Sequence, residues 1–186
     1  MTSSFIYQPH VHQSNNEIVT PDIAINRAYI FEDGRHSAVP LSHLNSHVVI
    51  QKPGNTLSVM PVVVLIEAGF GMLVSIGVAC PDSLLVSRKA WRYQDISGIY
   101  GNLTLRSLTI EARTPRVDSE VGIGELPSVA EIMEALGNRA GIKPGTAVFV
   151  MQKKISKKSV LADHYEVILE DPERCLSFAI ELQPIH

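Results

Sequence analysis

The chain has 186 residues, of which 45% are apolar and 19% are charged, and its formal net charge is −3. This balance excludes disorder over most of the chain, because apolar content is high and net charge is low. It also argues against a protein that coats nucleic acid, since 16 Lys and Arg against 19 Asp and Glu cannot neutralise many phosphates. We therefore expect no direct contact with nucleic acid.

The first twenty residues are polar and irregular, and we predict an N-terminal arm over 1–20 followed by a single domain over 21–186. No basic, apolar leader is visible at the N-terminus, which predicts a cytoplasmic protein. A first strand is expected over Ile23–Phe31, ended by the turn Glu32-Asp33-Gly34. A short helical turn over Ser42–His47 and a short strand over Val48–Ile50 follow.

The longest apolar stretch, Leu57–Cys80, carries a single charge, Glu67. Its length would suit a membrane span. The interrupting glycines and the valine-rich first half instead favour two buried strands, Leu57–Ile66 and Met72–Cys80, joined as a hairpin. We adopt the hairpin and expect no membrane contact. Cys80 and Cys175 lack the spacing of a disulfide or metal motif, and both are interpreted as small buried side chains.

The second half of the chain contains the clearest elements. The segment Ser83–Tyr93 has no clear type, whereas Leu103–Ala112 alternates with one phase slip, which predicts a strand with a bulge. A loop is expected over Thr114–Gly124. Ser128 and Glu131 form a capping box at the start of a helix, which Gly137 or Gly141 can end by taking the left-handed position. Three strands should then form an antiparallel meander: Thr146–Ile155, Val160–Leu169 and Cys175–Leu182.

The stretch from Leu126 to Leu182 resembles the C-terminal half of the UTRA effector-binding domain, the sensor of many GntR-type regulators. Three segments carry the resemblance: Ala140–Thr146 (AGIKPGT) beside the family's LGI-x-PGTP, Val148–Lys154 (VFVMQKK) beside its VLxxER strand, and the hairpin from Ser156 to Asp171. The family's GRPVE reads Lys158–Ala162 here, and its RGD turn reads Leu169–Asp171. Residues 1–50 contain no winged helix, so a free-standing module with an altered ligand site is implied.

The resemblance implies the chorismate lyase fold. The expected class is therefore α+β, a mainly antiparallel sheet with few helices, in a chorismate-lyase-like arrangement. The function expected first is a non-enzymatic regulatory module of transcription that binds a small anionic metabolite. The alternatives are a lyase of chorismate type that releases pyruvate, working by holding its substrate in a reactive conformation, and a structural subunit of a homo-oligomeric assembly. We expect a homo-oligomer, most simply a homodimer.

The candidate ligand-binding residues combine arginines with aromatic and titratable groups: Arg88, Trp91, Arg92, Arg106, His164 and Glu166. Arginine beside aromatic rings can hold an anionic ligand by forked hydrogen bonds and stacking. In the implied fold an arginine anchors a substrate carboxylate, and Arg106 is the analogue by position. The alternative is a solvated basic face. His164 and Glu166, two residues apart, allow acid–base chemistry or form a polar pair on a solvent face.

Five of the seven histidines precede residue 48: His10, His12, His36, His43 and His47. His10 and His12 with Glu17 have the spacing of the HxH-x4-E metal motif of cupins, and His43 and His47 would share one helical face. We interpret them as solvated loop or interface residues, with a metal site as the alternative. No catalytic residue, metal or cofactor is predicted.

Overall fold

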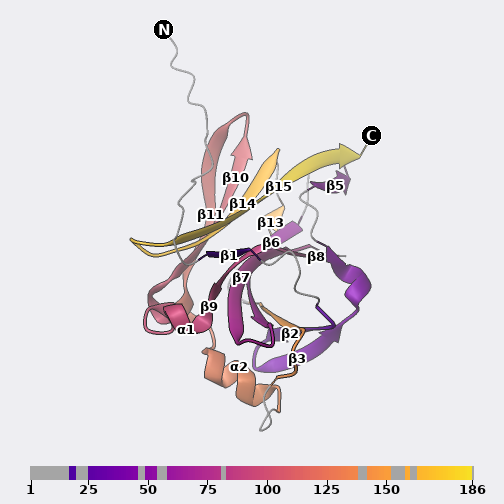
Figure 1. Cartoon of the computed structure of the whole chain (residues 1–186). Helices are drawn as coiled ribbons and strands as arrows, with labels where there is room; N and C mark the ends of the chain where they lie inside the picture. The colour runs from indigo at the N-terminus through magenta and orange to yellow at the C-terminus, as the bar shows by residue number, and fades with distance from the viewer. Residues whose placement is uncertain are drawn as a thin grey trace.

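The structure is a computed structural model, and it describes residues 17–19, 25–45, 49–53, 58–80, 83–137, 142–151, 158–159 and 163–185. Within these residues the chain forms two β-sheets, one of ten strands and one of five. Figure 1 shows the five-stranded sheet standing over one side of the larger sheet, with the helices α1 (Tyr93–Ile96) and α2 (Val129–Ala135) toward the opposite end.

The ten-stranded sheet has the order β1-β9-β7-β6-β12-β2-β3, with β13 beside β6, β8 beside β7 and β4 beside β8. Its strands are β1 (Glu17–Val19), β2 (Arg27–Glu32), β3 (Arg35–Val39), β4 (Leu44–Asn45), β6 (Ser58–Glu67), β7 (Met72–Ala79), β8 (Leu84–Val86), β9 (Lys89–Arg92), β12 (Thr146–Val150) and β13 (Lys158–Ser159). The segment Ser83–Tyr93, which had no clear sequence pattern, thus contributes two strands.

The hairpin β6–β7 is the centre of this sheet and confirms the interpretation of the long apolar stretch as two paired strands. Its turn needs Gly69 and Gly71, whose φ angles are +91° and +132°. The Glu67 carboxylate accepts a hydrogen bond from the Gly69 amide and so holds the turn. Among the described residues, no helix is long and apolar enough to cross a membrane.

The ten-stranded sheet curls on itself, so that both of its faces are buried. In Figure 1, β6, β7, β2, β3 and β8 surround a common interior. Side chains such as Val62, Val64 and Phe149 fill that interior. Gly77 of β7 makes the tightest approach here, because a Cβ at this position would lie 2.1 Å from the Leu85 carbonyl oxygen. The opposite face, with Val63, packs against the second sheet.

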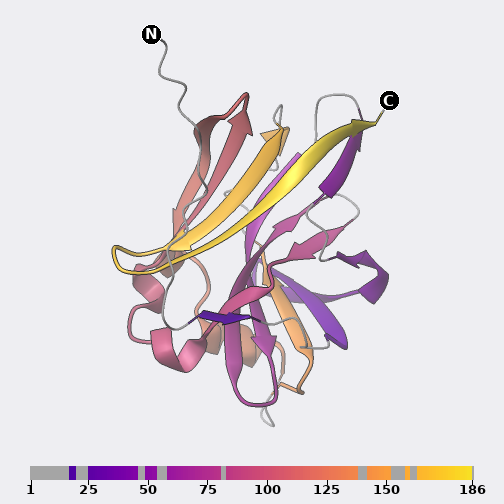
Figure 2. The ribbon, with the colours of Figure 1, turned by 45° about the horizontal axis from the view of Figure 1, so that its top comes forward.

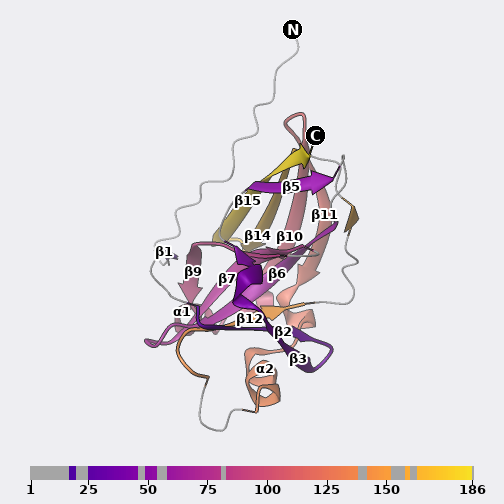
Figure 3. The same ribbon diagram turned by 90° about the vertical axis from the view of Figure 1, so that its right-hand side faces the viewer.

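The five-stranded sheet has the order β11-β10-β14-β15-β5 and its strands lie side by side in Figures 2 and 3. The strands are β5 (Val49–Pro53), β10 (Thr104–Glu111), β11 (Thr114–Gly122), β14 (His164–Glu170) and β15 (Cys175–Ile185). The predicted bulge is confirmed, since the register between β10 and β11 shifts between Ser107 and Leu108.

Two sequence expectations about strand pairing are wrong. The predicted loop Thr114–Gly124 is largely the strand β11, because alternate polar residues suit a sheet edge that faces solvent on one side. The predicted meander is broken: β14 and β15 pair antiparallel, but β12 belongs to the other sheet and pairs with β6 and, in parallel, with β2. Parallel pairing also joins β15 to β5 and β4 to β8.

The helices are short: η1 (Leu41–His43), α1 (Tyr93–Ile96), η2 (Tyr100–Asn102), η3 (Ile123–Glu125) and α2 (Val129–Ala135). The capping box at α2 is confirmed. The Ser128 hydroxyl accepts from the Glu131 amide, and the Glu131 carboxylate accepts from the Ser128 amide. Gly137, with φ of +74°, takes the left-handed position after the helix. The predicted turn over Ser42–His47 is limited to η1, followed at once by β4.

The predicted N-terminal arm lies mostly outside the described residues, apart from Glu17–Val19, which pair with β9. The division into an arm and one domain therefore stays a prediction. Both cysteines are buried, which confirms their interpretation as small buried side chains.

Candidate functional site

The two faces of the five-stranded sheet have different chemistry. One face, with Tyr165, Val167 and Leu169 of β14, packs on the ten-stranded sheet. The opposite face of this sheet is its outer face. The strand register arranges it in rows across β10, β14 and β15, and these rows are Thr104–Glu170–Cys175, Arg106–Ile168–Ser177, Leu108–Glu166–Ala179 and Ile110–His164–Glu181. Three of the predicted ligand-binding residues, Arg106, His164 and Glu166, thus share one surface.

A pocket with a volume of about 420 Å³ lies at one end of this face. It is lined by residues of η2, β10, the end of β14, the β14–β15 turn and the start of β15: Asn102, Thr104, Arg106, Glu170, Asp171, Pro172, Glu173, Arg174 and Cys175. This volume falls within the range of pockets that hold small molecules. The pocket contains the first row completely and Arg106 from the second.

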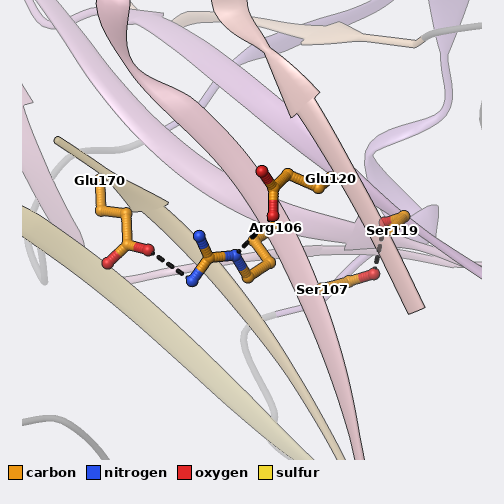
Figure 4. A network of polar contacts seen from close by, with 5 residues as sticks. All are labelled: Arg106, Ser107, Ser119, Glu120 and Glu170. Carbon is orange, nitrogen blue, oxygen red and sulfur yellow. Dashed lines mark hydrogen bonds and ion pairs between the residues drawn. The ribbon is translucent and has the colours of Figure 1, made fainter. Parts of the chain in front are cut away.

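Arg106 is held between two carboxylates (Figure 4). Its Nη1 lies 2.7 Å from Glu170 Oε1, and its Nε donates to Glu120 Oε2 at 3.1 Å. Glu120 lies directly opposite Arg106 on β11, and Glu170 lies one row along on β14. Because β10 is the strand between them, the guanidinium spans three strands and fixes one wall of the pocket.

The turn between β14 and β15 forms another part of the lining. Asp171 Oδ1 accepts hydrogen bonds from the backbone amides of Glu173, at 2.9 Å, and Arg174, at 2.7 Å. An aspartate that accepts from the backbone two and three residues ahead stabilises a tight turn. The side chains of Glu173 and Arg174 are therefore presented by a backbone of fixed shape, whereas the Asp171 carboxylate is committed to the turn.

Glu166, in the third row, is the most unusual group on the outer face. Its side chain is fully buried, at 0% exposure, and neither carboxylate oxygen has a hydrogen-bond partner among the described residues. Desolvation by burial raises the pKa of Glu166 from 4.5 to about 7. A carboxyl group is therefore available here that exchanges its proton near neutral pH.

The neighbours of Glu166 on the sheet are apolar. Leu108 and Ala179 lie opposite it on the neighbouring strands, and Ile168 lies next to it along β14. Leu108, Ile168 and Cys175 form a small apolar cluster on this face. The charged or titratable groups that share the face are Arg106, Glu120, His164, Glu170 and Glu181. None of these groups donates a hydrogen bond to the Glu166 carboxylate, so nothing compensates for the water that it loses on burial.

His164 begins β14 at the far end of the outer face and is largely accessible. Its Nε2 lies 3.8 Å from Glu181 Oε1, and the two side chains are 45% and 54% exposed. The register therefore places His164 beside Glu166 along one strand, but its near neighbour is Glu181 rather than the buried carboxyl group.

The other three predicted residues lie away from this surface. Trp91 is fully buried in the core between the two sheets. Arg88 and Arg92 are exposed, and the Arg92 guanidinium lies 5.8 Å from the ring centroid of Phe70 at the tip of the β6–β7 hairpin. The predicted basic and aromatic cluster is thus divided among a core position, a hairpin tip and the outer face.

A network of polar side chains lies on the inner face of the five-stranded sheet, on the opposite side of β10 and β11 from Arg106 and Glu120. Ser107 and Ser119 share a short hydrogen bond across β10 and β11, and Thr109 donates to Asp118 Oδ1 at 3.3 Å. Burial raises the pKa of Tyr165, while a hydrogen bond with Ser107 acts in the opposite direction. Sequence reasoning missed this network, because the alternation of serines and threonines on strands is also typical of a solvated face.

The fold is that of fumarylacetoacetate hydrolase-family proteins. A yeast protein of that family, ynq8, superposes with a TM-score of 0.62 at 7% identity, covering 86% of this chain and 93% of its own. A putative fumarylacetoacetate isomerase/hydrolase from Oleispira antarctica gives 0.56 at 8% identity, covering 87% and 94%. A 2-keto-3-deoxy-D-arabinonate dehydratase complexed with magnesium and 2,5-dioxopentanoate gives 0.54 at 11% identity, covering 82% and 64%.

By sequence, the chain belongs to the family described as "Protein of unknown function (DUF2848)", whose pattern it matches over residues 70–181. This range includes β7 to β15 up to Glu181, and with them the outer face and its pocket. No curated protein matches the chain.

These comparisons overturn the resemblance to a UTRA domain. The structure is α+β and mostly sheet, with few helices, as expected. The expected chorismate-lyase-like arrangement is wrong, because the similar solved structures have the fold of fumarylacetoacetate hydrolase-family proteins. The interpretations as a transcriptional sensor module and as a pyruvate-releasing chorismate lyase are wrong for the same reason. Nothing in the comparisons supports the structural-subunit alternative. Of the segments that suggested the UTRA domain, the strand Thr146–Val150 is observed, but the hairpin from Ser156 to Asp171 is not: Lys158–Ser159 pairs with β6 in one sheet and β14 lies in the other, while the rest of the hairpin's first half lies outside the described residues.

The magnesium ion of the dehydratase complex raises the question of a metal in this chain. Among the residues that the structure describes, no three His, Cys, Asp or Glu side chains are placed to hold one. His36 and His43 are exposed, and the HxH segment of the N-terminus, with His10 and His12, lies outside the described residues, as does His47. The donor set among the described residues therefore does not fit such an ion.

Proposed function

We propose that this chain is an enzyme that transfers a proton at the carbon beside a carbonyl group of a small oxo acid, with Glu166 as the proton acceptor. The observation that carries the proposal is the buried, unpartnered Glu166 carboxyl group, which lies on the same sheet face as the pocket. A small anionic metabolite was also the partner expected from the sequence.

The chemistry of the structural neighbours supports this class of reaction. Their names specify fumarylacetoacetate and 2-keto-3-deoxy-D-arabinonate, both of which are oxo acids. Elimination of water from a 2-keto-3-deoxy acid begins with removal of a proton from the carbon beside the keto group. In that step the C–H bond breaks, its electron pair forms the enolate, and the proton passes to a base.

The environment of Glu166 suits such a base. An acceptor works best when its pKa is close to the operating pH, and burial brings the pKa of this carboxyl group to about 7. Arg106 lies one row toward the pocket, roughly 7 Å along the strands, and its guanidinium can donate hydrogen bonds to a substrate oxygen there although its charge is balanced by Glu120 and Glu170. Glu166 is fully buried, so the chain around it has to move for substrate to reach the carboxyl group.

The test measures proton transfer directly. The full-length protein is incubated in D₂O with 2-keto-3-deoxy-D-arabinonate, with fumarylacetoacetate and with pyruvate, and deuterium incorporation beside the keto group is followed by NMR. We expect the wild type to accelerate exchange of at least one of them, Glu166→Gln to abolish it, and Glu166→Asp to retain part of it.

The matched control is Glu111→Gln. Glu111 is an exposed glutamate at the end of β10, the strand that pairs with β14, and its substitution should leave the rate of deuterium exchange unchanged. Equal exchange rates in wild type and Glu166→Gln, or no acceleration over buffer with any of the three acids, would overturn the proposal.

A further inference from the structure

The charges around the pocket distinguish between the two ends of an oxo acid. The lining residues carry two guanidinium groups, Arg106 and Arg174, against three carboxylates, Glu170, Asp171 and Glu173. The net charge of the lining is therefore −1 with all five groups ionised. A substrate carboxylate that entered this pocket would meet a surplus of like charge.

Arg106 does not compensate for that surplus. Its Nη1 is bonded to Glu170 and its Nε to Glu120, so two carboxylates already neutralise one guanidinium. A third carboxylate would have to displace one of them. The cation that the sequence suggested as a carboxylate anchor is thus engaged by its own protein.

The same lining is well suited to hydroxyl groups. A hydroxyl both donates and accepts, so it can donate to carboxylates such as Glu170 and Glu173 and accept from Arg106 or Arg174 without a net charge. Hydrogen bonds to charged partners are about twice as strong as those between neutral groups. Asn102 and Thr104 add polar side chains that can do both on the β10 side.

We infer that this pocket holds the hydroxylated end of the substrate, and that the substrate is therefore a polyhydroxylated oxo acid rather than a dicarboxylic one. The inference rests on the proposed function for the reaction at Glu166, and deepens it by naming the substrate class. It places the hydroxyl-bearing carbons in the first row of the outer face and the reacting carbon toward the third.

The test compares three unreactive five-carbon probes by calorimetry on the full-length protein. D-Arabinonate has hydroxyl groups and one carboxylate, pentanoate has one carboxylate only, and glutarate has two. We expect D-arabinonate to bind at least tenfold more tightly than pentanoate or glutarate. Glu173→Gln, at an exposed position, should weaken D-arabinonate binding about fivefold and leave pentanoate unaffected.

Glu170→Gln should also weaken D-arabinonate binding, and circular dichroism checks that its strands persist. Glu125→Gln, outside the pocket, is the control and should bind D-arabinonate as the wild type does. Tighter binding of glutarate than of D-arabinonate, weakened by Arg106→Gln, would overturn the inference, as would equal or undetectable binding of all three probes.

The two proposals fail separately. Glu166→Gln should still bind D-arabinonate as the wild type does. If D-arabinonate is preferred but no oxo acid exchanges its proton, the proposed function fails and the pocket inference stands. If exchange requires Glu166 but D-arabinonate is not preferred, the substrate class is wrong and the proposed function stands.

Discussion

Arg106 and Glu170 meet across neighbouring strands, with Nη1 and Oε1 2.7 Å apart, although the register pairs Glu170 with Thr104 and not with Arg106. The contact is diagonal, so it links two rows of the outer face and closes one side of the pocket. The Arg106 and Glu170 side chains are 32% and 28% exposed, which leaves the ion pair within reach of solvent and salt.

This pair is expected to contribute little to stability. A double-mutant cycle with Arg106→Gln and Glu170→Gln should give a coupling energy of about 0.2–1 kcal/mol, because partly exposed pairs are screened by water. The coupling should decrease at high salt. Urea unfolding measures it, followed by the fluorescence of the single tryptophan, Trp91, which is fully buried. A coupling above about 3 kcal/mol would mean that the pair is a buried structural element.

The buried carboxyl group of Glu166 should make the protein less stable as the pH rises. Its pKa is about 7 in the folded protein, against 4.5 for the exposed group. Between these values the folded state keeps a proton that the unfolded state has lost, so the free energy of unfolding falls from pH 4.5 to pH 7 and then levels off. The contribution lost is on the order of 3 kcal/mol.

Urea unfolding of wild type and Glu166→Gln at pH 5 and pH 8 measures this contribution. The variant carries no titrating group at this site, so its change in stability between the two pH values should be smaller than that of the wild type. Glu111→Gln, which removes an exposed carboxyl group, should behave as the wild type does. Parallel pH profiles for wild type and Glu166→Gln would show that the carboxyl group is not desolvated.

Loss of the Glu166 proton should raise the rate of catalysis as the pH increases, whereas it lowers the stability of the fold. If Glu166 accepts the substrate proton, only its ionised form is active, so the exchange rate should rise with pH and reach a plateau above about 7. The pH profile of deuterium incorporation in wild type and in Glu166→Asp is the measurement. A rate that falls between pH 6 and pH 8 would assign the proton transfer to another group.

Gly77 should not tolerate a side chain. A Cβ at this position would lie 2.1 Å from the Leu85 carbonyl oxygen, which belongs to the backbone of the paired strand and cannot move away without breaking the pairing. Gly77→Ala is expected to lower the free energy of unfolding by about 1–3 kcal/mol or more. Gly98→Ala is the control, because nothing lies within 4 Å of a Cβ there, and its unfolding curve should match that of the wild type.

The capping box of α2 should contribute measurably to stability despite the helix being only seven residues long. Ser128→Ala removes the hydroxyl that accepts from the Glu131 amide and is expected to cost about 1 kcal/mol in urea unfolding. Ser128→Asp keeps an acceptor at this position and should restore most of the loss. Equal stability of Ser128→Ala and wild type would indicate that water replaces the cap.

The local elements of this protein follow from its sequence, because their causes are local. The paired strands of β6 and β7 follow from an apolar run interrupted by glycines, the bulge of β10 from one phase slip, and the start of α2 from Ser128 and Glu131. The alternation along β10 also predicts that Arg106 points away from the core. Each of these depends on neighbouring residues along the chain.

The tertiary structure alone decided which strands share a sheet and therefore what the site contains. Thr146–Val150 is as strand-like as its neighbours, yet it joins β6 and β2 rather than β14, because burial on both faces suits a central strand of the larger sheet. The burial of Glu166 could not be read from the sequence either, since its neighbours Leu108 and Ala179 come from strands far away along the chain. Desolvation and ion pairing depend on distances between segments far apart in sequence, and only the folded chain sets those distances.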